Sequence, residues 1–283
     1  MKFGFVMPSG DARDAADLAA IAEDHGWDGF FVWEGIWSVD AWTCLAAAAM
    51  RTQRIRLGTM LTPLPRRKPW ELASQTSTLD NLSGGRVILA VGLGVSADEG
   101  DRWWLFEDDP GRVTRAEMLD EGLEMLQLLW RGEPFEFHGR HYRARRTDAL
   151  APAPQTPVQK PRIPIWVVGA WPRPKSMRRA AAWDGWLPNY LPKDGQHREL
   201  TPQVCADGVQ WIRTHRGADS MDGYDVVVEG VTSADDPAAA AATVRPWAEA
   251  GATWWLDANW SIPPEQVREE SERRLRAGPP RID

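Results

Sequence analysis

Carboxylates and tryptophans stand together where apolar segments of this sequence end. Glu34 lies between Trp33 and Trp37 just after one such segment, and Glu229 and Asp257 lie at or near the ends of two later segments. A carboxylate surrounded by indoles is partly removed from water, a setting that suits it to exchange a proton with a bound molecule. We therefore expect Glu34 to be the catalytic acid or base, with Trp33 and Trp37 beside it.

The segment from residue 87 to residue 94 predicts a place where a ligand approaches the backbone. Its apolar run leads into Gly92, Leu93 and Gly94. A continuous apolar run is typical of a strand buried on both faces of a parallel sheet, and ligands bind at the carboxyl ends of such strands. Because Gly92 and Gly94 carry no side chains, a flat or charged cofactor can come close to the main chain.

The elements that must position these residues alternate along the chain. Eight apolar segments are expected strands, each followed by a helix-like segment: residues 2–8, 29–34, 55–63, 87–94, 165–169, 185–190, 226–231 and 253–257. Asp11, Thr201 and Asp236 occupy helix-capping positions, the last two directly before prolines. This alternation predicts an α/β fold with a parallel sheet, and eight repeats predict a single (β/α)8 TIM-barrel domain over residues 1–283.

Two polar segments interrupt the alternation. Residues 95–111, after the fourth strand, form an acidic loop containing Asp98, Asp101, Trp103 and Trp104, at the barrel end where a lid is expected. Residues 132–164, before the fifth strand, are expected to form a hairpin around Gly139 and then an extended tract rich in proline, including Pro152 and Pro154. Both segments are interpreted as insertions into the one domain.

Composition narrows the class of partner. The formal net charge is -7, and the longest run of basic residues is Arg66-Arg67-Lys68, so we expect neither nucleic acid nor a membrane surface as a partner, but a small molecule. No apolar run reaches the roughly 18 residues of a membrane span. Cys44 and Cys205 are far apart, and the chain starts directly with a strand, which favours a cytoplasmic protein with free thiols. We expect no metal site.

Four stretches make the sequence similar to the luciferase-like monooxygenase superfamily, which comprises barrel enzymes that use reduced FMN or the deazaflavin coenzyme F-420. These stretches are residues 57–63, 78–94, 163–170 and 180–186. The resemblance spans nearly the whole chain and implies a bulge at the end of the third strand, often with a non-proline cis peptide. That bulge, at Met60-Leu61 or one residue to either side and so including Thr62, would support the cofactor ring from behind.

The resemblance also implies a phosphate site after the fifth and sixth strands. Backbone N–H groups, a serine hydroxyl and the start of a helix would hold the phosphate, which is the usual role of a helix amino terminus. The residues concerned are Val168, Gly169, Ala170, Ser176, Pro188 and Asn189. Trp171 would join Trp33, Trp37 and Trp260 around the open face of the ring, with Trp103 and Trp104 nearby, which favours a hydrophobic or aromatic substrate.

At the end of the second strand the sequence departs from the family pattern. Many deazaflavin-dependent relatives carry an Asp-His pair there, whereas this chain has Glu34 and Gly35, so the usual proton donor is absent. A flavin enzyme can work without a strong acid, because the cofactor performs the redox chemistry. The remaining candidates for proton exchange are Glu34, which we favour, and Asp98, Glu229, Asp257, His138 and His141.

The implied activity is hydride transfer between bound reduced F-420 and a small substrate. Two basic clusters, residues 66–68 and residues 173–179, would suit the polyglutamate tail of F-420. The alternatives are an FMNH2-dependent monooxygenase that activates oxygen, a non-catalytic flavin-binding relative, and a TIM-barrel glycoside hydrolase with a carboxylate pair drawn from Glu34, Glu229 and Asp257. By analogy, we expect a homodimer formed through the apolar helix at residues 42–50.

Overall fold

The barrel strands lie close to the expected positions in the computed structural model, which describes residues 1–100, 102–146, 155–216 and 221–282. They are β1 (Lys2–Met7), β2 (Gly29–Val32), β3 (Arg56–Thr59), β4 (Thr62–Pro63), β5 (Val87–Gly92), β8 (Ile165–Trp171), β9 (Gly185–Tyr190), β10 (Asp225–Gly230) and β11 (Trp254–Asp257). β3 and β4 are two pieces of one strand, interrupted at Met60 and Leu61. The eight expected strands are therefore all present.

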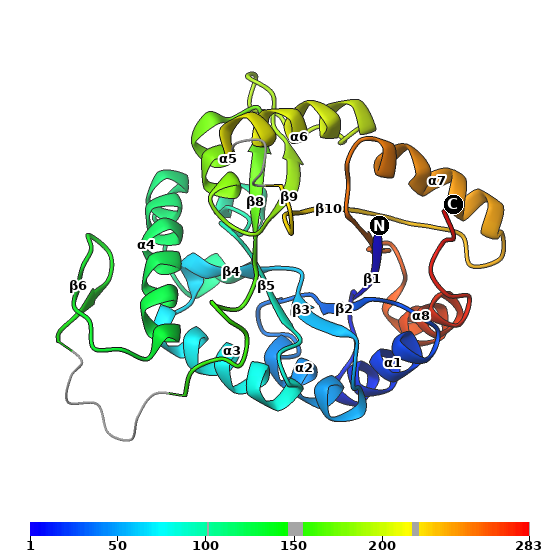
Figure 1. The fold of residues 1–283 in the computed structure, drawn as a ribbon, viewed down its shortest axis with the longest axis horizontal. Helices are drawn as coiled ribbons and strands as arrows, with labels where there is room; N and C mark the ends of the chain where they lie inside the picture. Colours follow the sequence, from blue (N-terminus) through cyan, green and yellow to red (C-terminus); the bar gives the residue numbers. More distant parts are fainter. Residues whose placement is uncertain (101, 147–154, 217–220, 283) are drawn as a thin grey trace.

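Parallel pairing closes these strands into a barrel. Their order is β3-β2-β1-β11-β10-β9-β8-β5-β4, and β3 also pairs with β5, which joins the two ends of the sheet. Figure 1 shows helices around the ring of strands. The helices are α1 (Ala12–Asp24), α2 (Ala41–Arg51), α3 (Pro69–Ser83), α4 (Arg112–Arg131), α5 (Pro174–Ala181), α6 (Pro202–Arg216), α7 (Pro237–Glu249) and α8 (Val267–Arg276). The predicted TIM barrel is confirmed.

Capping residues define the starts of several helices as expected. The Asp11 carboxylate accepts hydrogen bonds from the N–H groups of Arg13 and Asp14 at the start of α1, and Asp236 accepts one from Ala239 at the start of α7. α6 and α7 both begin at a proline, whose missing N–H has no partner to lose in the first turn. Three strand ends differ from the prediction by two residues, because β2 stops at Val32, β5 stops at Gly92 and β8 continues to Trp171, and the other ends lie within one residue of it.

Large aromatic side chains fill the barrel. The ring centroid of Trp166 lies 5.4 Å from that of Phe31 and 5.2 Å from that of Trp254. Glycines on neighbouring strands make room for these rings, since an added Cβ at Gly4 or Gly29 would lie within 2.8 Å of the Phe31 ring. Large residues facing small ones is how interior layers reach full packing density. Side chains fill the barrel at this depth, and barrels of this kind bind ligands at the carboxyl ends of their strands.

The expected hairpin is present as β6 (Phe137–His138) and β7 (Arg143–Ala144), and it lies on the outer side of α4 (Figure 1). Glu121 of α4 accepts hydrogen bonds from the N–H groups of Arg140, His141 and Tyr142 in its turn. His141 also pairs with Glu117 at 2.9 Å. The hairpin therefore packs against α4 and away from the barrel opening. Of the predicted insertions, Asp101, Pro152 and Pro154 lie outside the described residues.

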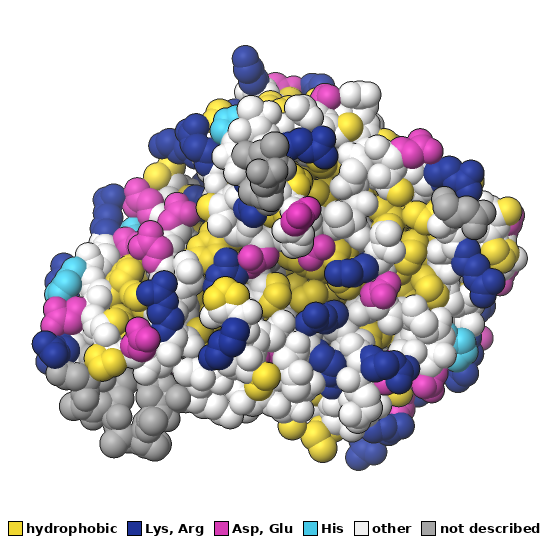
Figure 2. Space-filling view, in the orientation of Figure 1, with side chains coloured by type: hydrophobic (Ala, Val, Ile, Leu, Met, Phe, Trp, Pro, Cys, Tyr) yellow, Lys and Arg dark blue, Asp and Glu magenta, His cyan; other side chains and the backbone are white. Residues whose placement is uncertain are grey.

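The apolar helix α2 is covered within the chain. It packs between α1 and α3, and Trp42, Cys44 and Leu45 are buried there, whereas Met50 is 68% exposed. The apolar composition of α2 is thus explained by its contacts with α1 and α3. It no longer supports a homodimer through this helix, and the homodimer stays a prediction by analogy. Cys44 and Cys205 are both free and buried. Figure 2 shows Lys and Arg interspersed with Asp and Glu on the visible face. No helix in the described ranges is long and apolar enough to cross a membrane.

Candidate functional site

An apolar shelf lies at the barrel mouth, the opening at the carboxyl ends of the strands. We use the name apolar shelf for Met60, Leu61 and Val168, which are partly buried against the cluster that fills the barrel. A cis peptide bond joins Met60 to Leu61, at the position that the resemblance implied. A Cβ at Gly92 would lie 3.1 Å from Leu61 and 3.2 Å from Val168, so glycine there allows the shelf to form. The shelf offers an apolar surface for a ring.

The Ser176 hydroxyl at the start of α5 has the chemistry to bind an anion. Its oxygen accepts a hydrogen bond from the Ala170 N–H at 2.9 Å, and the hydroxyl hydrogen has no acceptor in the described part of the chain. A serine hydroxyl can accept and donate at once, so Ser176 can still donate to a ligand. The first turn of α5 adds unpaired backbone N–H groups, and Lys175 beside it is exposed. A phosphate would suit this place.

The residues of β8 differ from the expected phosphate cradle. The Ala170 N–H is already bonded to Ser176, so it is not free to donate to a phosphate. Gly169 makes room for the Trp186 indole, which lies 2.5 Å from where a Cβ would stand and donates to the Gly169 carbonyl at 2.9 Å. Trp171 packs against the layer between strands and helices and not around the barrel mouth. β8 continues to Trp171, which explains why its backbone is committed to the sheet.

On β9, the two expected cradle residues have different surroundings. Pro188 pairs in register with Gly169 and has no N–H to offer a phosphate. The Asn189 Oδ1 atom lies 2.9 Å from His197 Nδ1, and the amide nitrogen of Asn189 remains able to donate. His197 Nε2 lies 3.7 Å from Glu99 in the loop after β5. Asn189 thus connects the barrel mouth to two surrounding loops.

Glu34 is held by four hydrogen bonds. Arg67 donates to its Oε1 atom through Nε at 2.8 Å and Nη2 at 2.7 Å. Trp42 Nε1 at 3.2 Å and the Thr62 hydroxyl at 2.8 Å donate to its Oε2 atom. Because Thr62 gives its hydrogen to Glu34, the 2.8 Å contact between Thr59 and Thr62 must use the Thr59 hydrogen. Every partner donates, so both carboxylate oxygens of Glu34 act as acceptors.

Two predicted site residues belong to this network. The Glu34 side chain is only 8% exposed and is paired with Arg67, which disfavours it as the proton donor that we expected. Thr62 is fully buried and its hydroxyl donates to Glu34, which disfavours a contact between its side chain and a cofactor. Arg67 lies 33 residues after Glu34 in the chain, and a pairing at that separation has no local sequence signal.

Trp33 occupies the space beside Gly35. A Cβ at position 35 would lie 2.8 Å from Cζ3 of the Trp33 indole. The Trp33 ring is also edge-on to Trp260, with 6.5 Å between centroids. The Trp260 indole donates a hydrogen bond to Glu229, which lowers the pKa of that carboxyl, but the loss of hydration at the barrel mouth is larger and raises it overall. The sequence suggested this aromatic wall but not its link to Glu229.

Beside the barrel mouth lies a cavity of about 210 Å³, bounded by the loop after β2 and the loop after β5. Trp37 lines it but is 91% exposed, and its backbone has a φ of 46°, a left-handed value that is uncommon outside glycine. Its ring lies edge-on to Phe106, 6.2 Å away. The lining includes Glu34, Gly35, Ile36, Pro63, Arg66 and Trp103.

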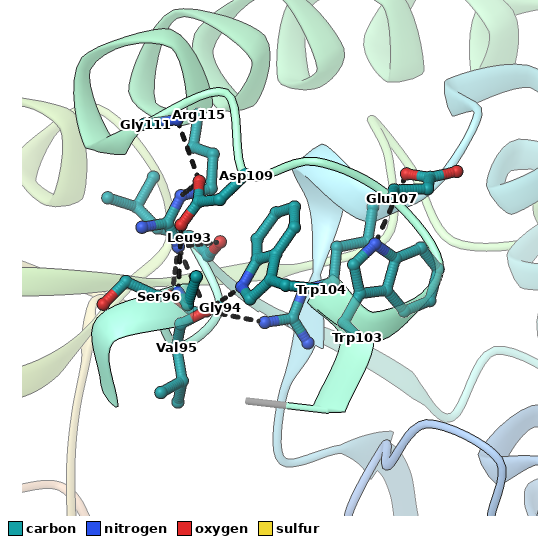
Figure 3. A network of polar contacts seen from close by, with 12 residues as sticks. Leu93, Gly94, Val95, Ser96, Trp103, Trp104, Glu107, Asp109, Gly111 and Arg115 are labelled. Atoms are coloured by element: carbon teal, nitrogen blue, oxygen red, sulfur yellow. Dashed lines mark hydrogen bonds and ion pairs between the residues drawn. The ribbon is translucent and has the colours of Figure 1, made fainter. Parts of the chain in front are cut away.

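The predicted lid loop, residues 95–111, is fixed at its base by Arg115 (Figure 3). The Arg115 side chain is 3% exposed, donates to the Gly94 carbonyl at 2.7 Å and pairs with Asp109 at 3.2 Å. The Val95 carbonyl accepts a hydrogen bond from Trp104 Nε1 at 2.9 Å. Gly94 has a φ of 74°, and an added Cβ would collide with the Arg66 guanidinium, so this glycine accommodates an arginine, where we expected a ring.

Most of the basic residues expected to hold an acidic tail have partners inside the protein. Arg66 donates to the Val95 carbonyl and stacks on Trp103 and Trp104, and Arg173 donates to the carbonyls of Leu191 and Pro192. Arg67 pairs with Glu34, and Arg179 pairs with Asp120. The exposed basic side chains in these two clusters are Lys68, Lys175 and Arg178.

The other expected acid–base candidates lie away from the apolar shelf. Asp257 is buried on the α8 side, where it accepts hydrogen bonds from Thr232 and Arg274. Asp98 and His138 are exposed, and His141 is held by Glu117 under the hairpin. Within the described ranges, no group of three or more His, Cys, Asp or Glu side chains is arranged to hold a metal ion.

Comparisons with known proteins agree with this geometry. A family model described as luciferase-like monooxygenase matches residues 1–281. A Mycobacterium tuberculosis protein whose name describes it as a coenzyme F-420-dependent oxidoreductase is 35% identical over 248 residues, which are 83% of this chain and 67% of that protein.

Two solved structures share the fold. The coenzyme F-420-dependent tetrahydromethanopterin reductase of Methanopyrus kandleri has a TM-score of 0.76 at 18% identity, covering 98% of this chain and 97% of that one. The oxygenating constituent of 3,6-diketocamphane monooxygenase from Pseudomonas putida, solved with FMN, has a TM-score of 0.65 at 19% identity, covering 82% and 67%.

Proposed function

The chain belongs to the luciferase-like monooxygenase family and is an oxidoreductase of that family, and we propose that it transfers a hydride between reduced coenzyme F-420 and a small hydrophobic or aromatic substrate. The observation that carries this proposal is the apolar shelf of Met60, Leu61 and Val168 on the same barrel rim as the Ser176 hydroxyl. A flat ring joined to a phosphate needs both surfaces. The M. tuberculosis relative, named for its use of F-420, supports this cofactor.

The residues present fit such a cofactor. The apolar shelf would support one face of the ring, while the Ser176 hydroxyl, the first turn of α5 and Lys175 would bind the phosphate. The bound deazaflavin would supply or accept the hydride. Trp33 and Trp260 would bound the open side of the ring, exclude water and orient an apolar substrate.

A second candidate is an FMNH2-dependent monooxygenase. It is favoured by the P. putida structure, which shares this fold and contains FMN. A hydroxyl and a helix start would serve either phosphate equally well. Exposed Lys175 and Arg178 favour F-420, because an acidic tail extends beyond the phosphate and these two side chains remain available to it. The hydrolase alternative loses support, since Glu34 and Asp257 pair separately with Arg67 and Arg274.

The test of the proposed function is turnover under two sets of conditions. The purified protein is mixed anaerobically with reduced F-420 and candidate hydride acceptors such as small enones and quinones, and F-420 oxidation is followed by absorbance. A parallel reaction contains FMNH2 and oxygen. We expect acceptor-dependent oxidation of reduced F-420 without oxygen. Turnover only with FMNH2 and oxygen would support the second candidate, and turnover in neither would contradict both.

A further inference from the structure

Glu229 faces the barrel mouth. Val227, two residues earlier on β10, belongs to the cluster inside the barrel, whereas Val226 and Val228 belong to the layer between strands and helices. Because side chains alternate along a strand, Glu229 lies on the same side as Val227. It is the second-last residue of β10, and its side chain is accessible. A ligand on the apolar shelf would therefore share the opening with this carboxyl.

Aromatic groups reduce the water around Glu229 without pairing it with a charge. Loss of hydration raises the pKa of Glu229, and the Trp260 indole is the hydrogen-bond donor that opposes this rise. Trp260 contacts Trp33, whose indole fills the space beside Gly35. One continuous set of contacts thus runs from the end of β2 to the end of β10. A carboxyl in such a place keeps its proton to a higher pH than an ordinary glutamate does and can release it to a bound molecule.

The other carboxyl groups near the mouth form hydrogen bonds and ion pairs with residues of the protein. Glu34 accepts four hydrogen bonds, two of them from Arg67. On β11, next to β10, Asp257 turns outward to Arg274. On the opposite flank, β9 presents Asn189, which is bonded to His197. Among these groups, His197 is the one imidazole, so a test of Glu229 has to control for it.

We propose that Glu229 exchanges the proton that accompanies hydride transfer to or from the substrate, an inference that rests on the function proposed above. In the reducing direction, a carbon of the substrate gains a hydride with its electron pair, and the adjoining atom of the reduced double bond takes the proton from the Glu229 carboxylic acid. The carboxylate that remains regains a proton from water. In the oxidising direction, Glu229 starts as the carboxylate and accepts the proton.

The first test observes the carboxyl itself. Protein labelled with 13C at the glutamate side-chain carboxyls is titrated by NMR, and Glu229→Gln identifies the Glu229 signal by its disappearance. We expect this signal to titrate above the ordinary range near pH 4.3 and to shift when oxidised F-420 is added. Glu249→Gln, the same change at an exposed residue of α7, should remove a different signal, one that does not respond to F-420. His197→Gln should leave the raised titration of Glu229 in place.

A Glu229 signal that titrates in the ordinary range, or that does not respond to bound F-420, would overturn the inference. The second test uses kinetics with reduced F-420 and 2-cyclohexen-1-one. Glu229→Gln should lower kcat by about 100-fold or more and abolish the fall of kcat that the wild type shows as the pH rises through the pKa of Glu229. Glu229→Asp, which keeps the acid but withdraws it by one methylene, should lower kcat and keep the pH dependence. Glu249→Gln should behave like the wild type.

The two tests separate this inference from the proposed function. Wild-type binding of F-420 with an unchanged rate and pH profile in Glu229→Gln would refute the role of Glu229 and leave hydride transfer standing. Failure of the wild type to bind F-420 would refute the proposed function and the inference together. Where 2-cyclohexen-1-one is not turned over, the carboxyl titration with F-420 decides.

Discussion

The Trp33 indole and the Gly35 backbone are packed so closely that a Cβ at position 35 would lie 2.8 Å from one indole carbon and 2.9 Å from the next. The resemblance to F-420-dependent enzymes implied a histidine at this position. In this chain an aromatic ring takes up that space, so the absence of the histidine is part of the packing of the barrel mouth. This packing is compatible with our proposal that Glu229, on another strand, exchanges the proton.

The packing predicts that Gly35→Ala destabilises the protein. The added methyl group forces the Trp33 ring to move, and overpacking of this kind costs about 1–3 kcal/mol. Urea unfolding of the wild type, Gly35→Ala, Trp33→Leu and the double variant measures the coupling. We expect the double variant to lose less stability than the sum of the single changes. Strict additivity would show that the two positions do not compete for space.

The ion pair between Arg67 and Glu34 gives a second prediction. Arg67→Met leaves the buried Glu34 carboxylate without its cation and should lower the free energy of unfolding by about 2 kcal/mol, less than for a fully buried pair because Arg67 is partly exposed. Adding Glu34→Gln removes the unpaired charge. Denaturant midpoints should therefore be higher for the double variant than for Arg67→Met alone, and an equal or lower midpoint would count against the pairing.

These two relationships show where a single sequence stops being informative. Local patterns predict the strands and the helix caps at Asp11 and Asp236, and the family resemblance predicts the break at Met60-Leu61. The partner of Glu34 does not, because Arg67 comes from a different βα unit and stands within an exposed-looking basic run. The run Arg66-Arg67-Lys68 predicted a basic rim for an acidic tail, but Arg67 pairs with Glu34 and Arg66 donates to the Val95 carbonyl, which leaves Lys68 exposed.

Ser176→Ala tests the proposed phosphate contact. Loss of one hydroxyl donor to a charged oxygen should weaken binding of F-420 and of FMN by about 10-fold or more, since hydrogen bonds to charged groups contribute about 1.5–3 kcal/mol. Fluorescence titration measures both constants. Ser74→Ala, whose hydroxyl bonds to the Trp70 carbonyl on α3, is the matched control and should bind normally. Equal affinities for Ser176→Ala and the wild type would place the phosphate elsewhere.

Acid should loosen the loop of residues 95–111. Burial opposes ionisation of Asp109, but hydrogen bonds from the N–H groups of Ala97 and Gly111, together with Arg115, lower its pKa overall. A carboxyl with a lowered pKa stabilises the folded loop above its unfolded pKa near 3.9, and that stabilisation is lost as the pH falls through the folded pKa. Pulsed hydrogen exchange at pH 6 and pH 3 should show loss of protection in this loop, ahead of α4.

Asp109→Asn provides the control for that experiment. It should expose the loop to exchange at pH 6 and remove most of the further change on acidification, because the ionisable group is gone. Equal loop protection in the variant and the wild type at pH 6 would contradict the anchoring role of the Asp109–Arg115 pair.

For Glu229 the sign is opposite. Its pKa is raised by lost hydration, so the unfolded chain releases this proton first as the pH rises and the folded state loses stability between the unfolded and folded pKa values. Glu229→Gln cannot ionise and escapes this loss. Compared with the wild type, its urea midpoint should be similar at pH 4 and higher at pH 8. A lower midpoint at pH 8 would show that the ionised carboxyl is stabilised in the folded protein.

The role of Glu229 also illustrates what the sequence could and could not show. Its position near the end of an apolar strand made it one candidate among several. Glu229 differs from Glu34 in its hydrogen-bond donors. Glu34 accepts hydrogen bonds from Trp42, Thr62 and Arg67, whereas Glu229 accepts one from the Trp260 indole. Which side chains surround a strand end depends on the closure of the barrel, which brings β10 and β2 to the same mouth and has no signature in either segment alone.

The central claim is that the barrel mouth binds a deazaflavin, and a competitive titration tests it most directly. The purified protein is titrated with F-420 and with FMN, each oxidised and reduced, and binding is followed by fluorescence, with Ser176→Ala measured alongside. We expect tight binding of F-420, weaker binding of FMN and a loss of F-420 affinity in Ser176→Ala. Binding of neither cofactor, or tight binding of FMN with no measurable affinity for F-420, would contradict it.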